Sequence, residues 1–159
     1  MGADLYLSSV SQKQFAKYEP LFEEWVSRRD ALQAAGNLAE AEAAQQKVET
    51  YYDKMYARGY FRDSYNNSNL LWLFKSSWWV DVSGTLTDDE GLMSPENARR
   101  LLCLLQEREP VFNANLQRVK LEAGESQETT EQYFREKYQQ LQAFLQEAID
   151  IDEAIICSL

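Results

Sequence analysis

The segment from residue 59 to residue 79 combines aromatic rings with asparagines and one Arg-Asp pair. The rings offer flat faces and the polar groups offer hydrogen bonds, a mixture that can bind a sugar, a nucleoside base or another protein. In an alternative interpretation the rings belong to the core, Arg62 and Asp63 pair locally, and the asparagines bond backbone groups at a turn. We predict a binding surface made of Tyr60, Arg62, Asp63, Tyr65, Asn66, Asn67, Asn69, Trp72 and Trp78.

Two pairs of carboxylates form a second candidate site. Glu125 and Glu128 are spaced E-x-x-E, and Glu147 and Asp150 are spaced E-x-x-D. This spacing resembles the magnesium-binding pattern of the all-α nucleotide pyrophosphatase family. The resemblance implies facing helices that hold Mg²⁺ for attack on a nucleoside triphosphate. The alternative is that the first pair lies in a solvated loop, GESQETT, and the second at a helix end. Magnesium is expected only under the hydrolase hypothesis, and no other cofactor is predicted.

The sequence contains no histidine. This excludes Ser-His and Cys-His catalysis and imidazole metal sites, so an enzyme would have to use carboxylates. The run DDEG at residues 88–91 has part of a calcium-loop pattern, but Leu86 and Asn97 occupy positions where that loop needs acidic ligands. We therefore predict a turn there and no catalytic residue.

Length and composition predict one domain over residues 1–159, since a chain of 159 residues with 45% hydrophobic residues can bury a core. No apolar run reaches the roughly 18 residues of a membrane span, and no targeting signal is visible, so we expect a cytoplasmic protein. Cys103 and Cys157 belong to no metal or redox motif and are predicted to be plain thiols.

The formal net charge of −10 argues against nucleic-acid binding, which depends on Lys and Arg neutralising phosphates. It suits a basic protein partner, or it serves solubility alone. The oligomeric state does not follow from the sequence.

Apolar residues recur every three or four positions in two neighbouring segments, which predicts a long antiparallel helical hairpin from about residue 12 to residue 58. Pro20 predicts a kink or a restart near residues 17–19. Further helices are predicted from Pro95, after Pro110, and from Thr129 or Thr130. Strand-like residues occur at 5–10 and 79–82. The predicted fold is mainly α: a helical bundle built on the hairpin, with at most a minor two-stranded β element.

These features favour a non-enzymatic, acidic protein-interaction factor of the inhibitor, immunity or adaptor type, which uses the aromatic segment as its contact surface. One alternative is a magnesium-dependent nucleotide hydrolase that uses the four carboxylates. Another is a protein that binds a small polar ligand in a pocket between residues 62 and 79.

Overall fold

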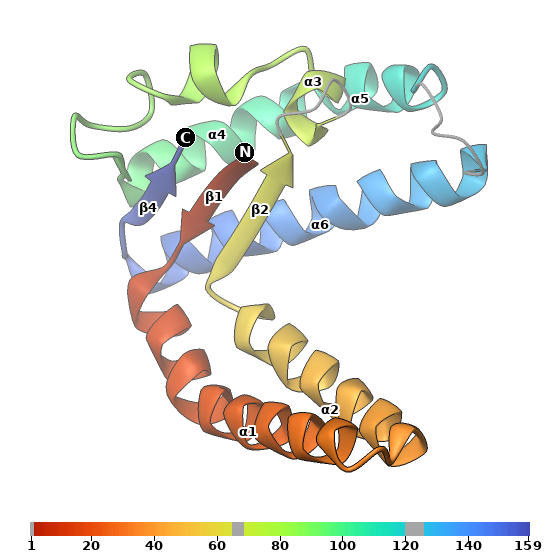
Figure 1. The fold of residues 1–159 in the computed structure, drawn as a ribbon. Helices are drawn as coiled ribbons and strands as arrows, with labels where there is room; N and C mark the ends of the chain where they lie inside the picture. Colours follow the sequence, from red (N-terminus) through yellow and green to blue (C-terminus); the bar gives the residue numbers. More distant parts are fainter. Residues whose placement is uncertain (1, 65–68, 120–125) are drawn as a thin grey trace. The chain divides into compact units, whose positions relative to one another are not determined.

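The computed structural model describes residues 2–64, 69–119 and 126–159, and the chain is mainly α-helical, as predicted (Figure 1). Its internal contacts divide it into two compact units. We name them the α1–α2 unit (Ser8–Tyr60) and the sheet unit (Met1–Leu7 with Phe61–Leu159). In chain order the elements are β1 (Gly2–Tyr6), α1 (Ser8–Ala34), α2 (Leu38–Tyr56), β2 (Tyr60–Ser64), α3 (Leu70–Leu73), η1 (Trp78–Val82), β3 (Leu92–Met93), α4 (Pro95–Glu107), α5 (Glu109–Leu116), α6 (Gln127–Ile151) and β4 (Ile155–Ser158). None of the helices in the described ranges is both long enough and apolar enough to cross a membrane.

The turn between α1 and α2 reverses the chain. Gly36 has a φ of +75°, in the left-handed region that glycine adopts without a Cβ clash. The backbone N–H of Asn37 donates to the carbonyl oxygen of Leu32 at 3.0 Å, which is the hydrogen bond that closes a Schellman motif at a helix C-terminus. The two helices leave this turn in opposite directions and lie side by side (Figure 1).

Small side chains of α2 allow α1 to approach closely. The buried residues of α2 are Ala41, Ala44, Val48 and Met55, whereas α1, all of which the structure describes, has no fully buried side chain. Rings close the remaining space, for example Phe15 of α1 against Tyr56 of α2 at 5.2 Å between centroids. The seam between the helices therefore combines close backbone approach with half-buried rings.

Pro20 lies inside α1, which continues from Ser8 to Ala34 without a break. The predicted restart is therefore wrong. Figure 1 shows that the helix curves along its length. A proline inside a helix removes one backbone hydrogen bond, which is a common cause of bending.

The four strands lie in the order β2, β1, β4, β3. β4 is antiparallel to both β1 and β3, and Leu5 of β1 lies opposite Cys157 of β4. Alternate side chains point to opposite faces of a strand, and the inward set of these two strands is buried. It consists of Ala3, Leu5, Ile155 and Cys157.

The predicted β element is wrong in size and position. The structure has four strands rather than two, the chain is helical from Ser8, and residues 78–82 form the π-helix η1. β4 pairs with β1 across about 150 positions of sequence, and no local pattern could indicate that pairing. The predicted bundle built on the hairpin is not confirmed, because α1 and α2 form a unit of their own and the other helices belong to the sheet unit.

Aromatic stacking joins the helices of the sheet unit. Phe74, directly after α3, stacks on Phe112 of α5 at 4.6 Å, and Tyr138 of α6 lies 4.9 Å and 5.2 Å from these two rings. Burial, followed by the charge of Glu109, raises the pKa of Tyr138 to about 12. α3, α5 and α6 thus share one core.

Serine caps begin the two long helices of this unit. Ser94 Oγ accepts from the N–H of Asn97 at 3.1 Å, and α4 begins at Pro95 as predicted. Ser126 Oγ accepts from the N–H of Thr129 at 3.1 Å, so α6 begins at Gln127, slightly before the predicted start.

The two cysteines should differ in reactivity. Cys157 is buried in β4 and its burial raises the pKa of the thiol to about 12, whereas Cys103 is exposed. Because the thiolate is the reactive form, iodoacetamide at about pH 8 should label Cys103 and leave Cys157 unlabelled in the native chain. Peptide mass spectrometry measures this, and labelling of both thiols in denaturant is the control. Rapid native labelling of Cys157 would show that β4 does not stay packed.

Candidate protein-binding surface

The predicted surface is divided among three parts of the chain. The residues that belong to the sheet unit and are described are Arg62, Asp63, Asn69, Trp72 and Trp78. Tyr60 belongs to the α1–α2 unit, where its ring centroid lies 5.0 Å from that of Tyr56. Outside the described residues are Tyr65, Asn66 and Asn67.

The carboxylate of Asp63 is the polar centre of the described part. The residue is 3% exposed. Its Oδ1 accepts from the backbone N–H groups of Ser64 and Leu70, both at 3.0 Å. Its Oδ2 accepts from the N–H of Leu71 at 3.4 Å and from the indole N–H of Trp78 at 2.8 Å. A single side chain therefore ties β2 to α3 and to η1.

Burial and hydrogen bonding shift the pKa of Asp63 in opposite directions. Burial, the larger effect, raises the pKa of this carboxyl, while its hydrogen bonds and the charge of Lys137 lower it. The pKa of Lys137 is lowered by burial and raised by Asp63. The Lys137 ammonium also lies over the rings of Phe61 and Tyr133, at 5.5 Å and 5.7 Å. Both charged groups are engaged by the protein itself, which is typical of a structural pair.

Short side chains fix the two small helical elements of the segment. Asn69 caps α3 by accepting from the N–H of Trp72 at 2.9 Å. Ser77 caps η1 in the same way, and its own N–H donates to Asp81 at 2.8 Å. In helices this short, few backbone N–H groups have a partner within the helix. The side chains of Asn69 and Ser77 accept hydrogen bonds from some of them instead. The backbone of residues 69–81 is therefore restrained by these side chains.

The tryptophans of this segment face in different directions. Trp78 is 2% exposed, whereas Trp72 is 57% exposed and Trp79 is 68% exposed. Val80, next in the chain, is 75% exposed. The backbone of η1 places Trp78 against the core and leaves Trp79 and Val80 at the surface. The predicted surface did not include Trp79 or Val80, and residues 79–82, expected as strand-like, lie in η1.

The described members of the predicted surface fall into two groups. Asp63, Asn69 and Trp78 are buried and form the support of the segment, whereas Arg62 and Trp72 are exposed. Arg62 lies 3.8 Å from Asp4 of β1, while Asp63 points to the opposite face of β2. An ion pair at this distance adds little stability when its Arg side chain is exposed.

The three described carboxylates of the hydrolase hypothesis lie at two ends of one helix. Glu128 lies in the first turn of α6, and Glu147 and Asp150 lie near its other end. Nineteen residues of helix separate Glu128 from Glu147, which corresponds to about 28 Å at 1.5 Å per residue. Glu125 lies outside the described residues. Among residues 2–64, 69–119 and 126–159, no group of three or more His, Cys, Asp or Glu side chains could hold a metal ion.

Comparison with known proteins gives no match: no protein-family model, no curated protein and no solved structure is significantly similar to this chain. Function must therefore be inferred from the exposed side chains and from the buried network beneath them.

Replacing Asp63 by Asn should destabilise the sheet unit. The amide offers one acceptor oxygen instead of two, so its NH₂ group would face two of the buried N–H donors. A buried donor without a partner costs about 1–3 kcal/mol, and we expect the free energy of unfolding to fall by about 2–4 kcal/mol. Urea unfolding followed by tryptophan fluorescence would measure this, because Trp78 is one of the donors.

Asp89→Asn is the matched control, because it makes the same change at an exposed carboxylate of the same unit. Its free energy of unfolding should change by less than about 1 kcal/mol. Equal stability of D63N and the unsubstituted chain would contradict the role of Asp63 as the centre of the segment.

Proposed function

We propose that this chain is a non-enzymatic protein-interaction factor of the inhibitor, immunity or adaptor type. Its contact surface is the exposed side of residues 72–80, which carries Trp72, Trp79 and Val80. The observation that supports the proposal is that these large apolar side chains are exposed on a segment whose backbone is fixed by Asp63, Asn69 and Ser77.

Exposed tryptophans on a fixed backbone suit protein recognition. Single exposed apolar residues are common and need no explanation. Trp72 and Trp79, however, are both more than half exposed within one short segment, and tryptophan is enriched among the residues that dominate binding energy. A segment whose backbone is already restrained loses less entropy when a partner binds, which increases affinity.

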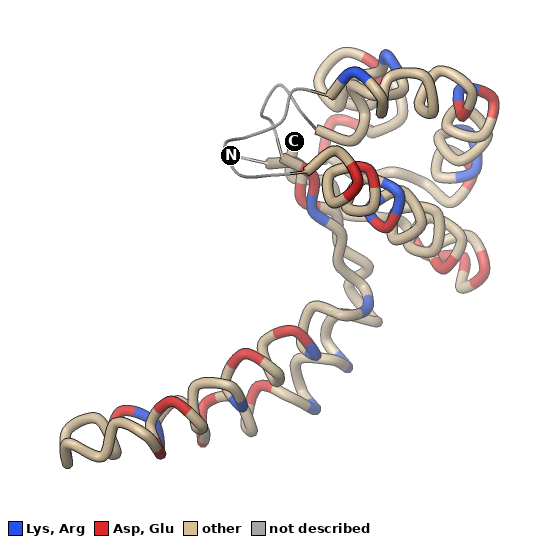
Figure 2. Tube along the Cα trace, turned by 90° about the vertical axis from the view of Figure 1, so that its right-hand side faces the viewer, with Lys and Arg blue, Asp and Glu red and all other residues tan. Residues whose placement is uncertain are grey.

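The charge around this segment favours a basic partner. Residues 69–93 contain one basic residue, Lys75, against four acidic residues: Asp81, Asp88, Asp89 and Glu90. The sheet unit as a whole has nine basic and eighteen acidic residues, and Figure 2 marks them along its backbone. Complementary charge raises association rates and disfavours wrong partners. We infer a partner with Lys and Arg around an apolar contact.

The chemistry of the chain also supports a non-enzymatic role. The sequence has no histidine to act as a base near neutral pH. The described carboxylates of the magnesium hypothesis lie at opposite ends of α6. Asp63 accepts hydrogen bonds from the chain's own N–H groups, and Lys137 lies over two of its rings. No specific observation favours a hydrolase or a small-ligand pocket.

The double variant W72A/W79A should lose the partner. Immobilised chain would be used to capture proteins from a lysate of the source cells, and captured proteins would be quantified by mass spectrometry. We expect the specific partner to decrease by about tenfold or more, since hot-spot truncations cost about 2 kcal/mol or more. The purified partner should then show the same loss of affinity by calorimetry.

Leu38→Ser is the control, because Leu38 is a large apolar residue, 71% exposed, on the other unit. It should capture the partner as well as the unsubstituted chain does. Melting temperatures close to that of the unsubstituted chain would show that both variants fold. Undiminished capture by folded W72A/W79A would refute this surface.

A further inference from the structure

The α1–α2 unit carries a row of aromatic rings along one side of its seam. Phe15 packs on Tyr56 at 5.2 Å, Tyr56 on Tyr52 at 4.8 Å, and Tyr52 on Phe22 at 6.1 Å between centroids. We name these four residues the ring row. None is fully buried, and Tyr52 is 50% exposed. The ring row is thus an apolar surface that the two helices cover only in part.

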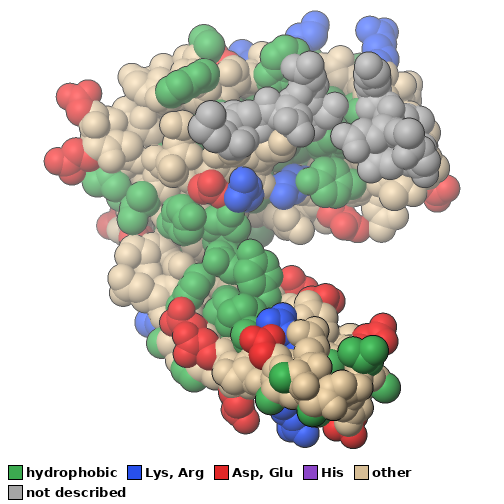
Figure 3. All heavy atoms as spheres, viewed as in Figure 1, with side chains coloured by type: hydrophobic (Ala, Val, Ile, Leu, Met, Phe, Trp, Pro, Cys, Tyr) green, Lys and Arg blue, Asp and Glu red, His purple; other side chains and the backbone are tan. Residues whose placement is uncertain are grey.

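Acidic residues flank the ring row on both helices. Glu19 and Glu23 lie four residues apart on α1, and Glu49 and Asp53 lie four residues apart on α2. All four are exposed. At about 100° per residue, Glu23 is next to Phe22 and Glu49 is next to Tyr52 on the outer edges of the row. Figure 3 shows hydrophobic side chains gathered on this unit with acidic side chains at their edge.

Each of these acidic pairs has an internal electrostatic cost. Residues four apart on a helix are neighbours, and like charges at this spacing destabilise the helix. A cation placed between the members of each pair would remove the repulsion. A partner with basic residues on both sides of an apolar stripe would do so on α1 and α2 together.

The opposite side of the same seam has a different character. Lys17 and Lys54 lie over the ring of Tyr18 at 5.0 Å and 5.7 Å, Lys54 lies over Tyr51 at 5.3 Å, and Arg28 lies over Trp25 at 4.9 Å. There the rings are covered by cations of the chain itself. The acidic side and the basic side of the unit are therefore distinct surfaces.

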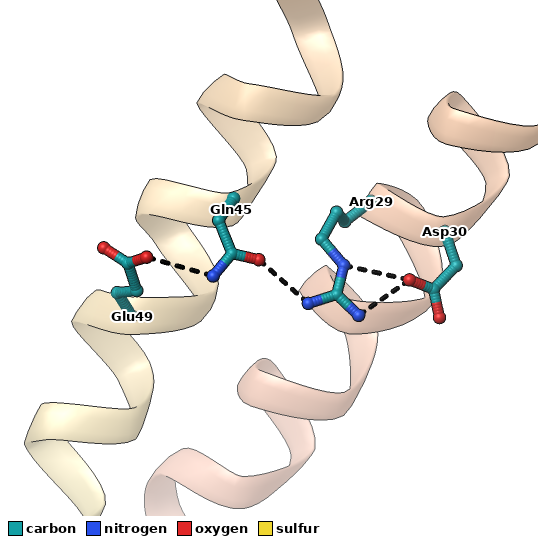
Figure 4. A network of polar contacts seen from close by, with 4 residues as sticks. All are labelled: Arg29, Asp30, Gln45 and Glu49. Carbon is teal, nitrogen blue, oxygen red and sulfur yellow. Dashed lines mark hydrogen bonds and ion pairs between the residues drawn. The ribbon is translucent and has the colours of Figure 1, made fainter. Parts of the chain in front are cut away.

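A polar network lies between the ring row and the turn that joins α1 to α2. Arg29 of α1 donates to Gln45 of α2 at 2.8 Å, and Gln45 donates to Glu49 at 3.0 Å (Figure 4). Arg29 also binds Asp30 at 2.7 Å. Figure 4 shows the two carboxylates at the outer ends of the network. This network fixes how the helices align and places acidic groups at both edges of the surface.

We propose that the ring row is the docking site of a basic amphipathic helix, supplied by a partner protein. Its apolar stripe would lie along the rings and its Lys or Arg residues would meet the acidic pairs, as when a helix binds in a groove. α2 has 19 residues, about 28 Å of helix, so a partner helix of similar length would extend beyond the ring row to the acidic residues on both helices.

The docking site is tested with the full chain and a synthetic helix of leucine and lysine, about 18 residues long and so close to the length of α2. Tyr51 and Tyr52 are adjacent residues on opposite sides of the seam and give a matched pair of variants. In isothermal calorimetry we expect Y52A to weaken binding by about tenfold and Y51A by less than about twofold. E19Q/E23Q, which keeps the rings, should weaken binding and reduce its dependence on salt concentration.

Three outcomes would overturn the proposal. One is no binding of the peptide, and another is equal weakening by Y51A and Y52A. The third is a dimer of the free chain in sedimentation velocity that Y52A dissociates, since the ring row would then be occupied by a second copy. A leucine–glutamate peptide should not bind, because the acidic pairs would repel it. W72A/W79A should bind the lysine peptide normally, so this test is independent of the surface on residues 72–80.

Discussion

The burial of one carboxylate is the constraint on which the sheet unit's exposed segment depends. Asp63 is enclosed, and an enclosed carboxylate is stable only when donors surround it. The donors come from two short elements, α3 and η1, which have few backbone hydrogen bonds of their own. Asp63 and these elements therefore stabilise each other. Loss of either partner would leave buried polar groups unsatisfied, which explains how four-residue and five-residue helices persist beside a strand.

The same constraint determines which side chains face outward. The bond from the Trp78 indole to Asp63 holds this ring in the core at 2.8 Å. Trp79, the next residue of η1, lies at the surface. The Asn69 cap likewise begins α3 so that Leu70, Leu71 and Leu73 are buried and Trp72 is exposed. The exposed rings thus follow from how the core is packed, on a backbone restrained by the hydrogen bonds of Asp63 and Asn69.

Local signals in the sequence predicted local structure well. Pro95 marked the start of α4, because a proline in the first turn of a helix is a signal that depends on backbone conformation within a few residues. The pairing of β1 with β4 depends on residues at the two ends of the sequence and left no local signal. The role of Asp63 was missed for a related reason. Its neighbour Arg62 suggested a local ion pair, but successive residues of a strand face opposite sides, and the partners of Asp63 are backbone groups up to eight positions away and an indole fifteen positions away.

The net charge of the whole chain is divided unequally between the two units. The α1–α2 unit has seven basic and eight acidic residues, whereas the sheet unit carries most of the charge of −10. A distant basic partner is therefore attracted mainly by the sheet unit. Around the α1–α2 unit, fields of opposite sign cancel beyond a Debye length of about 8 Å at physiological salt. Within that distance the acidic pairs beside the ring row and the lysines over Tyr18 act separately. Recognition by this unit must therefore be decided at contact, where the order of charges along each helix matters more than their sum.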